Sequence, residues 1–144
     1  YYSPYYHTAP SIHKGVGILL LIALAVRFGW RLANVKPSDE GFTDFEKTAS
    51  RVVHRGFYPL LLALMVSGYL ISTADGRPID VFGLFSVPSP GENTGLEDTA
   101  GVVHAYLAYF TIALAAAHAA GALKHHFVDR DRTLSRMWSG PRKS

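Results

Sequence analysis

The segment GVVHAYLAYFTIALAAAHAAGAL, residues 101–123, decides the fold, because it is long and apolar enough to cross a bilayer as one helix. It contains two histidines, His104 and His118, 14 positions apart. At about 100° per residue, this spacing returns to nearly the same helix face, about 21 Å further along the axis. Ionisable side chains inside a membrane helix are costly and mark functional sites by default. Two aligned histidines therefore suggest two stacked cofactors; the alternative is a pair that is hydrogen-bonded for packing.

The composition also points to the membrane. Of the 144 residues, 49% are hydrophobic and only 17% are charged, and two further windows, residues 15–33 and 52–73, have the length and polarity of membrane helices. We therefore predict an all-α transmembrane helix bundle, built as one membrane-integral domain over residues 1–144. Its three spans are expected at about residues 12–33, 48–73 and 97–124.

The chain contains no cysteine. This excludes iron–sulfur clusters held by thiolates, haem attached covalently through a C-x-x-C-H motif, and disulfide bonds. Any haem must be held non-covalently, by histidine or methionine. The net charge of +3 comes from Lys and Arg at the helix ends, so we interpret it as a topology signal and expect no nucleic-acid partner.

Lys and Arg are distributed unevenly among the connections. They are frequent after the first span and in the tail after the third, whereas the loop of residues 74–100 has only Arg77 among five acidic residues. By the positive-inside rule, the middle connection and the C-terminus face the cytoplasm, and the N-terminus and the acidic loop face outward.

Local signals indicate where the spans begin. Pro10-Ser11 is a suitable entry to the first helix, and T-G-L-E at residues 94–97 has capping-box spacing, which predicts that the third helix starts near Leu96. The stretch FGLFSVPSPGEN, residues 82–93, is predicted to be a Pro/Gly-rich outer loop whose apolar side chains reach the membrane interface.

The histidines can be placed by depth. His13 at the outer end of the first span and His104 at the outer end of the third share one level, whereas His118 lies deeper. A six-coordinate b-type haem needs two neutral imidazoles on opposite sides of the iron, which facing helices supply, so His13 and His104 form a natural pair. Gly17 and Gly101, close to these histidines, either leave room for a porphyrin or allow close helix packing.

Arg27 repeats the spacing, 14 residues after His13, at the depth of His118. A guanidinium at this level suits a haem propionate, since it pairs bidentately with carboxylate; the alternative is that Arg27 snorkels to the cytoplasmic interface. His118 has no obvious partner in the sequence. His54 is nearest in depth, but it lies close to the interface.

These residues give the chain a family resemblance over essentially its whole length. SIHKGVG at residues 11–17, the spacing of His104 and His118, and HHFVDRDRTLSRM at residues 125–137 resemble the bacterial cytochrome b561 family. The resemblance implies a di-haem b-type cytochrome of the bacterial inner membrane, built on four transmembrane helices, one of which would precede the three predicted spans.

The resemblance also implies haem ligands. They fall on His104 and His118 in the last helix and on His13, which would pair with His104. The family's remaining ligand belongs to an N-terminal helix, which would come before Tyr1. We therefore expect the sequence to be incomplete at its N-terminus; if it is complete, the inner haem depends on His54 as a substitute.

The implied function is transmembrane electron transfer through two b haems, with quinone at the cytoplasmic face and an unknown redox partner at the periplasmic face. The candidate residues on the quinone side are His54, His125 and His126. Both an electron-transfer cytochrome and a quinone-linked oxidoreductase fit these features, and no separate catalytic residue is predicted. Membrane lipid surrounds the spans, and a homodimer is left open.

Two other functional classes compete with this one. The first is a haem-bearing membrane anchor subunit of a larger oxidoreductase complex, with the acidic loop of residues 74–100 as its docking surface. The second is a proton or metal transporter that uses the row of histidines. A transporter would be expected to have acidic residues inside its apolar windows, and these windows have none.

Overall fold

The structure is a computed structural model that describes residues 5–34 and 43–128, apart from the side chains of Glu46 and His125. It contains five elements: α1 (Tyr5–Ala33), α2 (Asp44–Thr73), β1 (Ile79–Val81), β2 (Phe85–Val87) and α3 (Leu96–Phe127). The described residues divide into two compact units, one ending at Ala108 and the other beginning at Tyr109.

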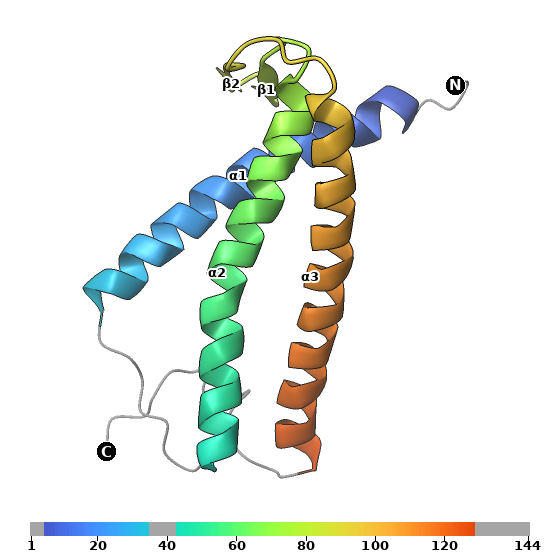
Figure 1. The fold of residues 1–144 in the computed structure, drawn as a ribbon. Coiled ribbons are helices and arrows are strands. Elements are labelled where there is room, and N and C mark those ends of the chain that lie inside the picture. Colours follow the sequence, from blue (N-terminus) through green and yellow to red (C-terminus); the bar gives the residue numbers. More distant parts are fainter. Residues whose placement is uncertain (1–4, 35–42, 129–144) are drawn as a thin grey trace. The chain divides into compact units, whose positions relative to one another are not determined.

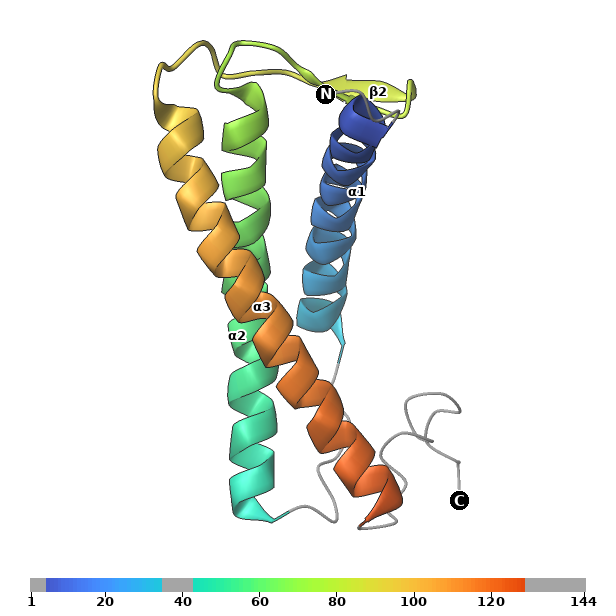
Figure 2. The same ribbon diagram turned by 90° about the vertical axis from the view of Figure 1, so that its right-hand side faces the viewer.

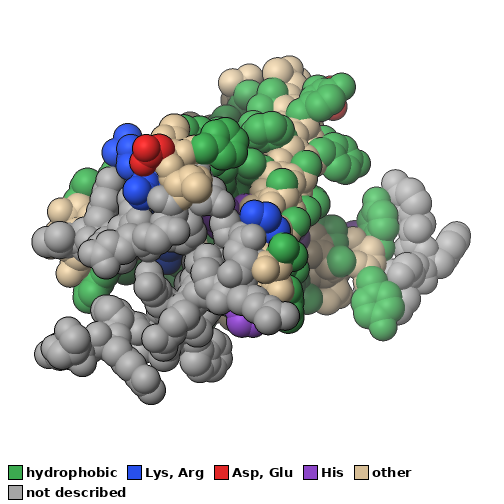
Figure 3. Space-filling model, turned by 90° about the horizontal axis from the view of Figure 1, so that it is seen from below, with side chains coloured by type: hydrophobic (Ala, Val, Ile, Leu, Met, Phe, Trp, Pro, Cys, Tyr) green, Lys and Arg blue, Asp and Glu red, His purple; other side chains and the backbone are tan. Residues whose placement is uncertain are grey.

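Three helices are long and apolar enough to cross a membrane: Tyr5–Ala33, Lys47–Thr73 and Leu96–Lys124. They confirm the predicted all-α transmembrane fold. Most of their apolar side chains are exposed, Trp30 and Tyr106 among them, and Figure 3 shows hydrophobic side chains along the outer faces of the helices. In water such surfaces would be unfavourable, so lipid is the solvent that the sequence requires.

The first helix begins earlier than predicted. α1 starts at Tyr5, and Pro10 lies inside it, so the helix entry predicted at Pro10-Ser11 is wrong. Proline has no N–H, so Pro10 leaves the carbonyl of Tyr6 without its usual helical donor. The loss falls in the second turn, where it interrupts few bonds, and the helix continues through it.

The third helix begins at Leu96, as the capping-box spacing predicts. The Leu96 amide donates to the carbonyl of Asn93 at 3.2 Å, which closes the turn before the helix. Glu97 and Asp98 stand in the first helical turn, where negative charge interacts favourably with the helix dipole. The helix then runs to Phe127 without a break and contains both His104 and His118.

The stretch between α2 and α3 contains a β-hairpin rather than the irregular loop that the sequence predicts. β1 and β2 pair antiparallel with Ile79 opposite Val87 and Val81 opposite Phe85. The Pro/Gly content of the stretch conceals the alternation of I-D-V and F-S-V, which is the signal for short strands. The sequence therefore predicts correctly that this segment separates two helices, but it does not predict the two strands.

The hairpin turns through two residues in the left-handed region. Phe82 has φ 56° and Gly83 has φ 71°, and the Leu84 amide donates to the Val81 carbonyl at 3.0 Å. These two residues are the first two of the three, 82–84, that connect the paired Val81 and Phe85. A phenylalanine in this region is strained, so the surroundings of Phe82 must favour the conformation.

The small core of the first unit lies beneath this hairpin. Val81 is fully buried and clusters with Ile79 of the same strand and Ile18 of α1, while Tyr69 of α2 packs against the cluster. The hairpin therefore joins the beginning of α1 to the end of α2, as Figures 1 and 2 show.

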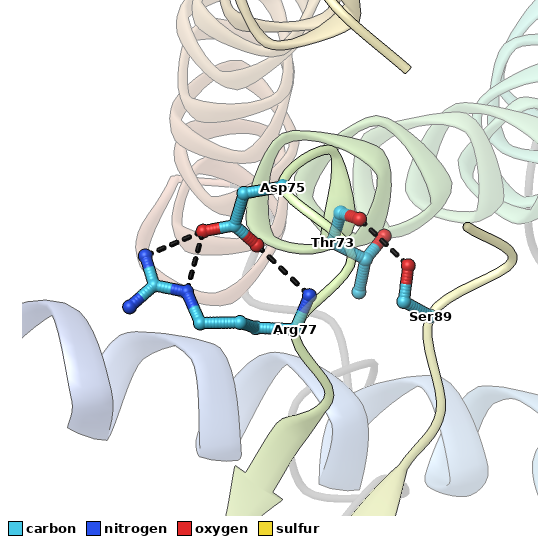
Figure 4. Close-up of polar contacts among 4 residues, drawn as sticks. All are labelled: Thr73, Asp75, Arg77 and Ser89. Atoms are coloured by element: carbon cyan, nitrogen blue, oxygen red, sulfur yellow. Dashed lines mark hydrogen bonds and ion pairs between the residues drawn. The ribbon is translucent and has the colours of Figure 1, made fainter. Parts of the chain in front are cut away.

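Polar contacts hold the connection in place (Figure 4). Ser89 donates its hydroxyl proton to the Thr73 carbonyl at 2.7 Å, so the loop after β2 is tied to the end of α2. Asp75 accepts hydrogen bonds from the backbone N–H and the Nε of Arg77, at 3.0 and 2.6 Å, and the two side chains form an ion pair. This end of the first unit is thus ordered by packing and by hydrogen bonds.

Candidate haem site

Two histidines that are far apart in the sequence meet in the first unit. The imidazole rings of His13 on α1 and His104 on α3 have centroids 6.1 Å apart, with their planes at 89°. His13 is exposed and His104 is half-buried. The pair expected from depth alone is therefore a pair in space.

The second nitrogen of His104 is bonded to α2. Its Nδ1 lies 2.9 Å from the carbonyl oxygen of Leu64 and 3.0 Å from Oγ of Ser67. The Ser67 hydroxyl itself donates to the Leu64 carbonyl at 2.8 Å. A carbonyl only accepts hydrogen bonds, so Nδ1 of His104 carries the ring proton in this arrangement. Nε2 then has the free lone pair that a metal needs.

A glycine allows His104 to approach α2 so closely. A Cβ built at Gly68 would lie 3.0 Å from Cε1 and 3.3 Å from Nδ1 of His104. Any other residue would press against the ring. Sequence reasoning does not connect Ser67 and Gly68 with the site, although a pair of small residues in an apolar span is typical of a close helix contact.

The separation of the two ring centres is compatible with two imidazoles on one metal. With about 2 Å from a metal to each imidazole nitrogen and about 1.2 Å from nitrogen to ring centre, two trans imidazoles have centroids about 6.4 Å apart. The observed 6.1 Å is close to this value. No group of three or more metal-binding side chains occurs among the described residues. The candidate site thus offers two imidazoles, which is the number that a six-coordinate haem takes from the protein.

The glycines beside the histidines border open space. A Cβ at Gly17 or at Gly101 would meet no atom within 4 Å. Within the part of the chain that the structure describes, neither glycine is therefore in a tight helix contact, and room beside the histidines is the interpretation that the structure favours.

The other candidate residues of the first unit lie away from this pair. Arg27 is exposed on α1. His54 is half-buried near the start of α2, with Nδ1 3.4 Å from Oγ of Ser50. It is 13 residues before Ser67, which is about 20 Å along the helix.

In the second unit, His118 is half-buried on α3. His126 is also half-buried, and its ring meets that of Phe127 edge-on at 4.8 Å. The side chain of His125 lies outside the described residues.

A cavity of about 550 Å³ lies near the outer pair, between α1 and the start of the hairpin. Its lining includes Lys14, the residue after His13, and the ion pair of Asp75 with Arg77. Hydrogen bonds from Arg77 hold the pKa of Asp75 below its usual value, and Lys14 lowers it further. Asp75 is therefore ionised at neutral pH, and positive and negative side chains face the cavity together.

An apolar helix bundle that presents paired imidazoles is the arrangement of a membrane b-type cytochrome. Comparison with known proteins gives the same class. A family model described as prokaryotic cytochrome b561 matches residues 1–140. The chain belongs to this family, and it is a bacterial membrane protein that binds b-type haem and has a role in electron transfer.

Several relatives match most of the chain. It is 45% identical over 139 residues to "Cytochrome b561 homolog 2" of Escherichia coli (strain K12), which covers 95% of this chain and 74% of the relative. It is 35% identical over 130 residues to "Probable superoxide oxidase CybB" of Yersinia pestis, covering 88% and 72%. "Cytochrome b561 homolog 1" of Escherichia coli (strain K12) is 25% identical over 122 residues, covering 85% and 68%.

Proposed function

We propose that this cytochrome carries electrons across the bacterial inner membrane through two b haems. His13 and His104 would hold the outer haem, and His118 would contribute one ligand to the inner one. The observation that carries the proposal is the 6.1 Å separation of the His13 and His104 rings, which suits two imidazoles on one iron.

The protein's contribution follows from its side chains. When bound, haem supplies one-electron exchange between ferric and ferrous iron. His13 and His104 would together hold the outer haem through their two imidazoles, an arrangement that would serve electron transfer rather than oxygen binding. The apolar helices exclude water, and burial and hydrogen bonding at the ligands tune the potential. The Arg27 guanidinium would suit a haem propionate, and snorkelling is the alternative role.

The cytoplasmic end of this path exchanges electrons with quinone. We assign three histidines to that side: His54 near the start of α2, and His125 and His126 at the end of α3. Support comes from the basic residues at the end of α1, in the following connection and at the start of α2, namely Arg31, Lys36, Lys47 and Arg51, which by the positive-inside rule favour a cytoplasmic location. The C-terminus lies on the same side.

At the periplasmic face the partner is a small oxidant or reductant. One relative is named a probable superoxide oxidase. The cavity beside Lys14, close in sequence to His13, is large enough for a reactant of that size. The reactant would exchange its electron with the haem that His13 and His104 would hold.

The second candidate function is that of a haem-bearing membrane anchor for a soluble redox subunit. The exposed hairpin residues Leu84 and Phe85, which lie within the acidic loop of residues 74–100, favour this alternative. Purification under mild conditions distinguishes the two functions. A stoichiometric soluble subunit supports the anchor, and a preparation of this chain alone that reduces or oxidises quinone supports the independent cytochrome.

Haem quantification tests the proposal. We expect two b haems per chain in the protein purified from its native membrane, and quinone-dependent oxidation of both after reduction. If the protein holds a single haem that remains after His118 is substituted but is lost when His104 is substituted, the result supports the outer site and contradicts the inner one.

A further inference from the structure

We propose that Ser67 is a positioning residue, which acts through His104 to set the redox potential of the outer haem. The inference rests on the proposed function, in which His104 is an axial ligand. Its evidence is the three-way contact of Ser67 Oγ, the Leu64 carbonyl and Nδ1 of His104, with distances between 2.8 and 3.0 Å.

The protons of this contact can be assigned from the chemistry of its atoms. The Leu64 carbonyl is an acceptor only, so it takes a hydrogen bond from Nδ1 of His104 and another from the Ser67 hydroxyl. With its proton directed at the carbonyl, Oγ of Ser67 presents a lone pair to the same Nδ1–H. His104 is thereby held as the tautomer with an unprotonated Nε2, which is the form that binds iron.

The position of Ser67 indicates a role beyond helix formation. Ser67 is 6% exposed and lies six residues before the end of α2, a helix long and apolar enough to cross a membrane. A hydroxyl in an apolar environment is costly unless it is hydrogen-bonded, and serine that bonds back to its own helix slightly weakens that helix. Alanine would be the better helix former at this site. The contact with His104 is the interaction that the hydroxyl adds.

An acceptor at the outer nitrogen changes the ligand. When a metal-bound histidine donates its other N–H, the ring becomes more basic and its orientation is fixed. A more basic imidazole stabilises ferric over ferrous iron. Ser67 therefore holds the midpoint potential of the outer haem lower than the Leu64 carbonyl would alone.

The test uses Ser67→Ala in the complete haem-loaded protein. Loss of one of two acceptors is expected to raise the ferrous-to-ferric ratio of the outer haem at a fixed potential about threefold. By 59 mV per tenfold change, this is a positive midpoint shift of about 28 mV. The low-spin ferric electron paramagnetic resonance signal of that haem should change with it, and the inner haem should not.

A matched control lies on the same helix. Thr73 is buried, and its hydroxyl donates to the Tyr69 carbonyl at 2.8 Å. Like Ser67, it is therefore a buried residue of α2 whose hydroxyl is bonded to a carbonyl of the same helix. None of the described contacts of Thr73 involves His104. Thr73→Val is expected to leave the midpoint potential of the outer haem unchanged. Ser67→Thr keeps the hydroxyl, so it is also expected to have the midpoint potential of the unaltered protein.

Each outcome is decisive. A Ser67→Ala protein with full haem content and an unchanged midpoint potential overturns the inference and leaves the proposed function intact. The same holds if Thr73→Val shifts the midpoint potential as much as Ser67→Ala does. If Ser67→Ala loses the outer haem, its return in Ser67→Thr supports the inference, and continued loss overturns it. Retention of the outer haem in His104→Ala contradicts the proposed function itself.

Discussion

The ring of Phe82 fills the space beside Gly15: a Cβ at that glycine would lie 2.8 Å from Cε2 and Cζ of the ring. Phe82 is at the hairpin turn, and Gly15 is buried on α1, two residues after His13. The hairpin is thus packed against the helix that carries one of the paired histidines. This contact gives the strained conformation of Phe82 a structural reason.

Gly15→Ala should destabilise the protein through this contact. The added methyl overlaps the Phe82 ring, and overpacking of this kind costs about 1–3 kcal/mol. Thermal unfolding in detergent measures the effect. In a Phe82→Ala background the overlap is gone, so the same substitution should cost less. An equal cost in both backgrounds would mean that Phe82 does not account for the glycine.

Gly68→Ala should weaken the outer haem site. The new Cβ would lie 3.0 Å from Cε1 of His104, so the ring must move and its bonds to Leu64 and Ser67 lengthen. We expect a lower content of the outer haem, or a shifted midpoint, in reduced-minus-oxidised spectra. Gly56→Ala is the matched control, because a Cβ there meets no atom within 4 Å. A defect of the same size in the control would show that α2 is sensitive to any substitution of glycine.

His104→Ala should remove the outer haem and leave the inner one spectrally intact. The two proposed sites use different histidines of α3, and His118 is 14 residues further along the helix. Haem content and low-temperature absorption spectra give the result. Equal loss of both haems would argue against two separate sites.

The ion pair of Asp75 and Arg77 predicts how the stability of the segment after α2 depends on pH. Hydrogen bonds from Arg77 hold the pKa of Asp75 below 3.8 in the folded protein. A carboxyl group whose pKa is lowered by folding stabilises the folded protein at pH values above its pKa in the unfolded chain, which is about 3.9. This contribution is lost as the pH falls through the lower, folded pKa, so it is constant from about pH 5 to neutrality.

The backbone amide of Arg77 reports this titration, because it donates to Asp75 at 3.0 Å. Its NMR shift should be flat near neutral pH and move with a midpoint below 3.8, and Asp75→Asn should abolish the transition. A midpoint at or above the usual value would show that the ion pair does not form in the membrane protein.

The sequence was sufficient for the existence of the three long apolar helices, because span length is a local property. The depth of His13 and His104 in their spans also predicted that their two rings lie close together. The sequence did not reveal the hairpin, where strands of only three residues are hidden among glycine and proline. It also missed the contact of His104 with Leu64 and Ser67. That contact depends on how α2 and the beginning of α3 are aligned against each other, and periodicity within one helix carries no such information.

The central claim is that His13 and His104 bind the same iron, and absorption spectroscopy of matched single variants tests it most directly. His13→Ala and His104→Ala, purified in detergent beside the unaltered protein, should each lose the same b-haem component of the dithionite-reduced spectrum, while His118→Ala retains it. Loss of different components in the two variants, or a colourless unaltered protein that hemin does not reconstitute, would contradict the account.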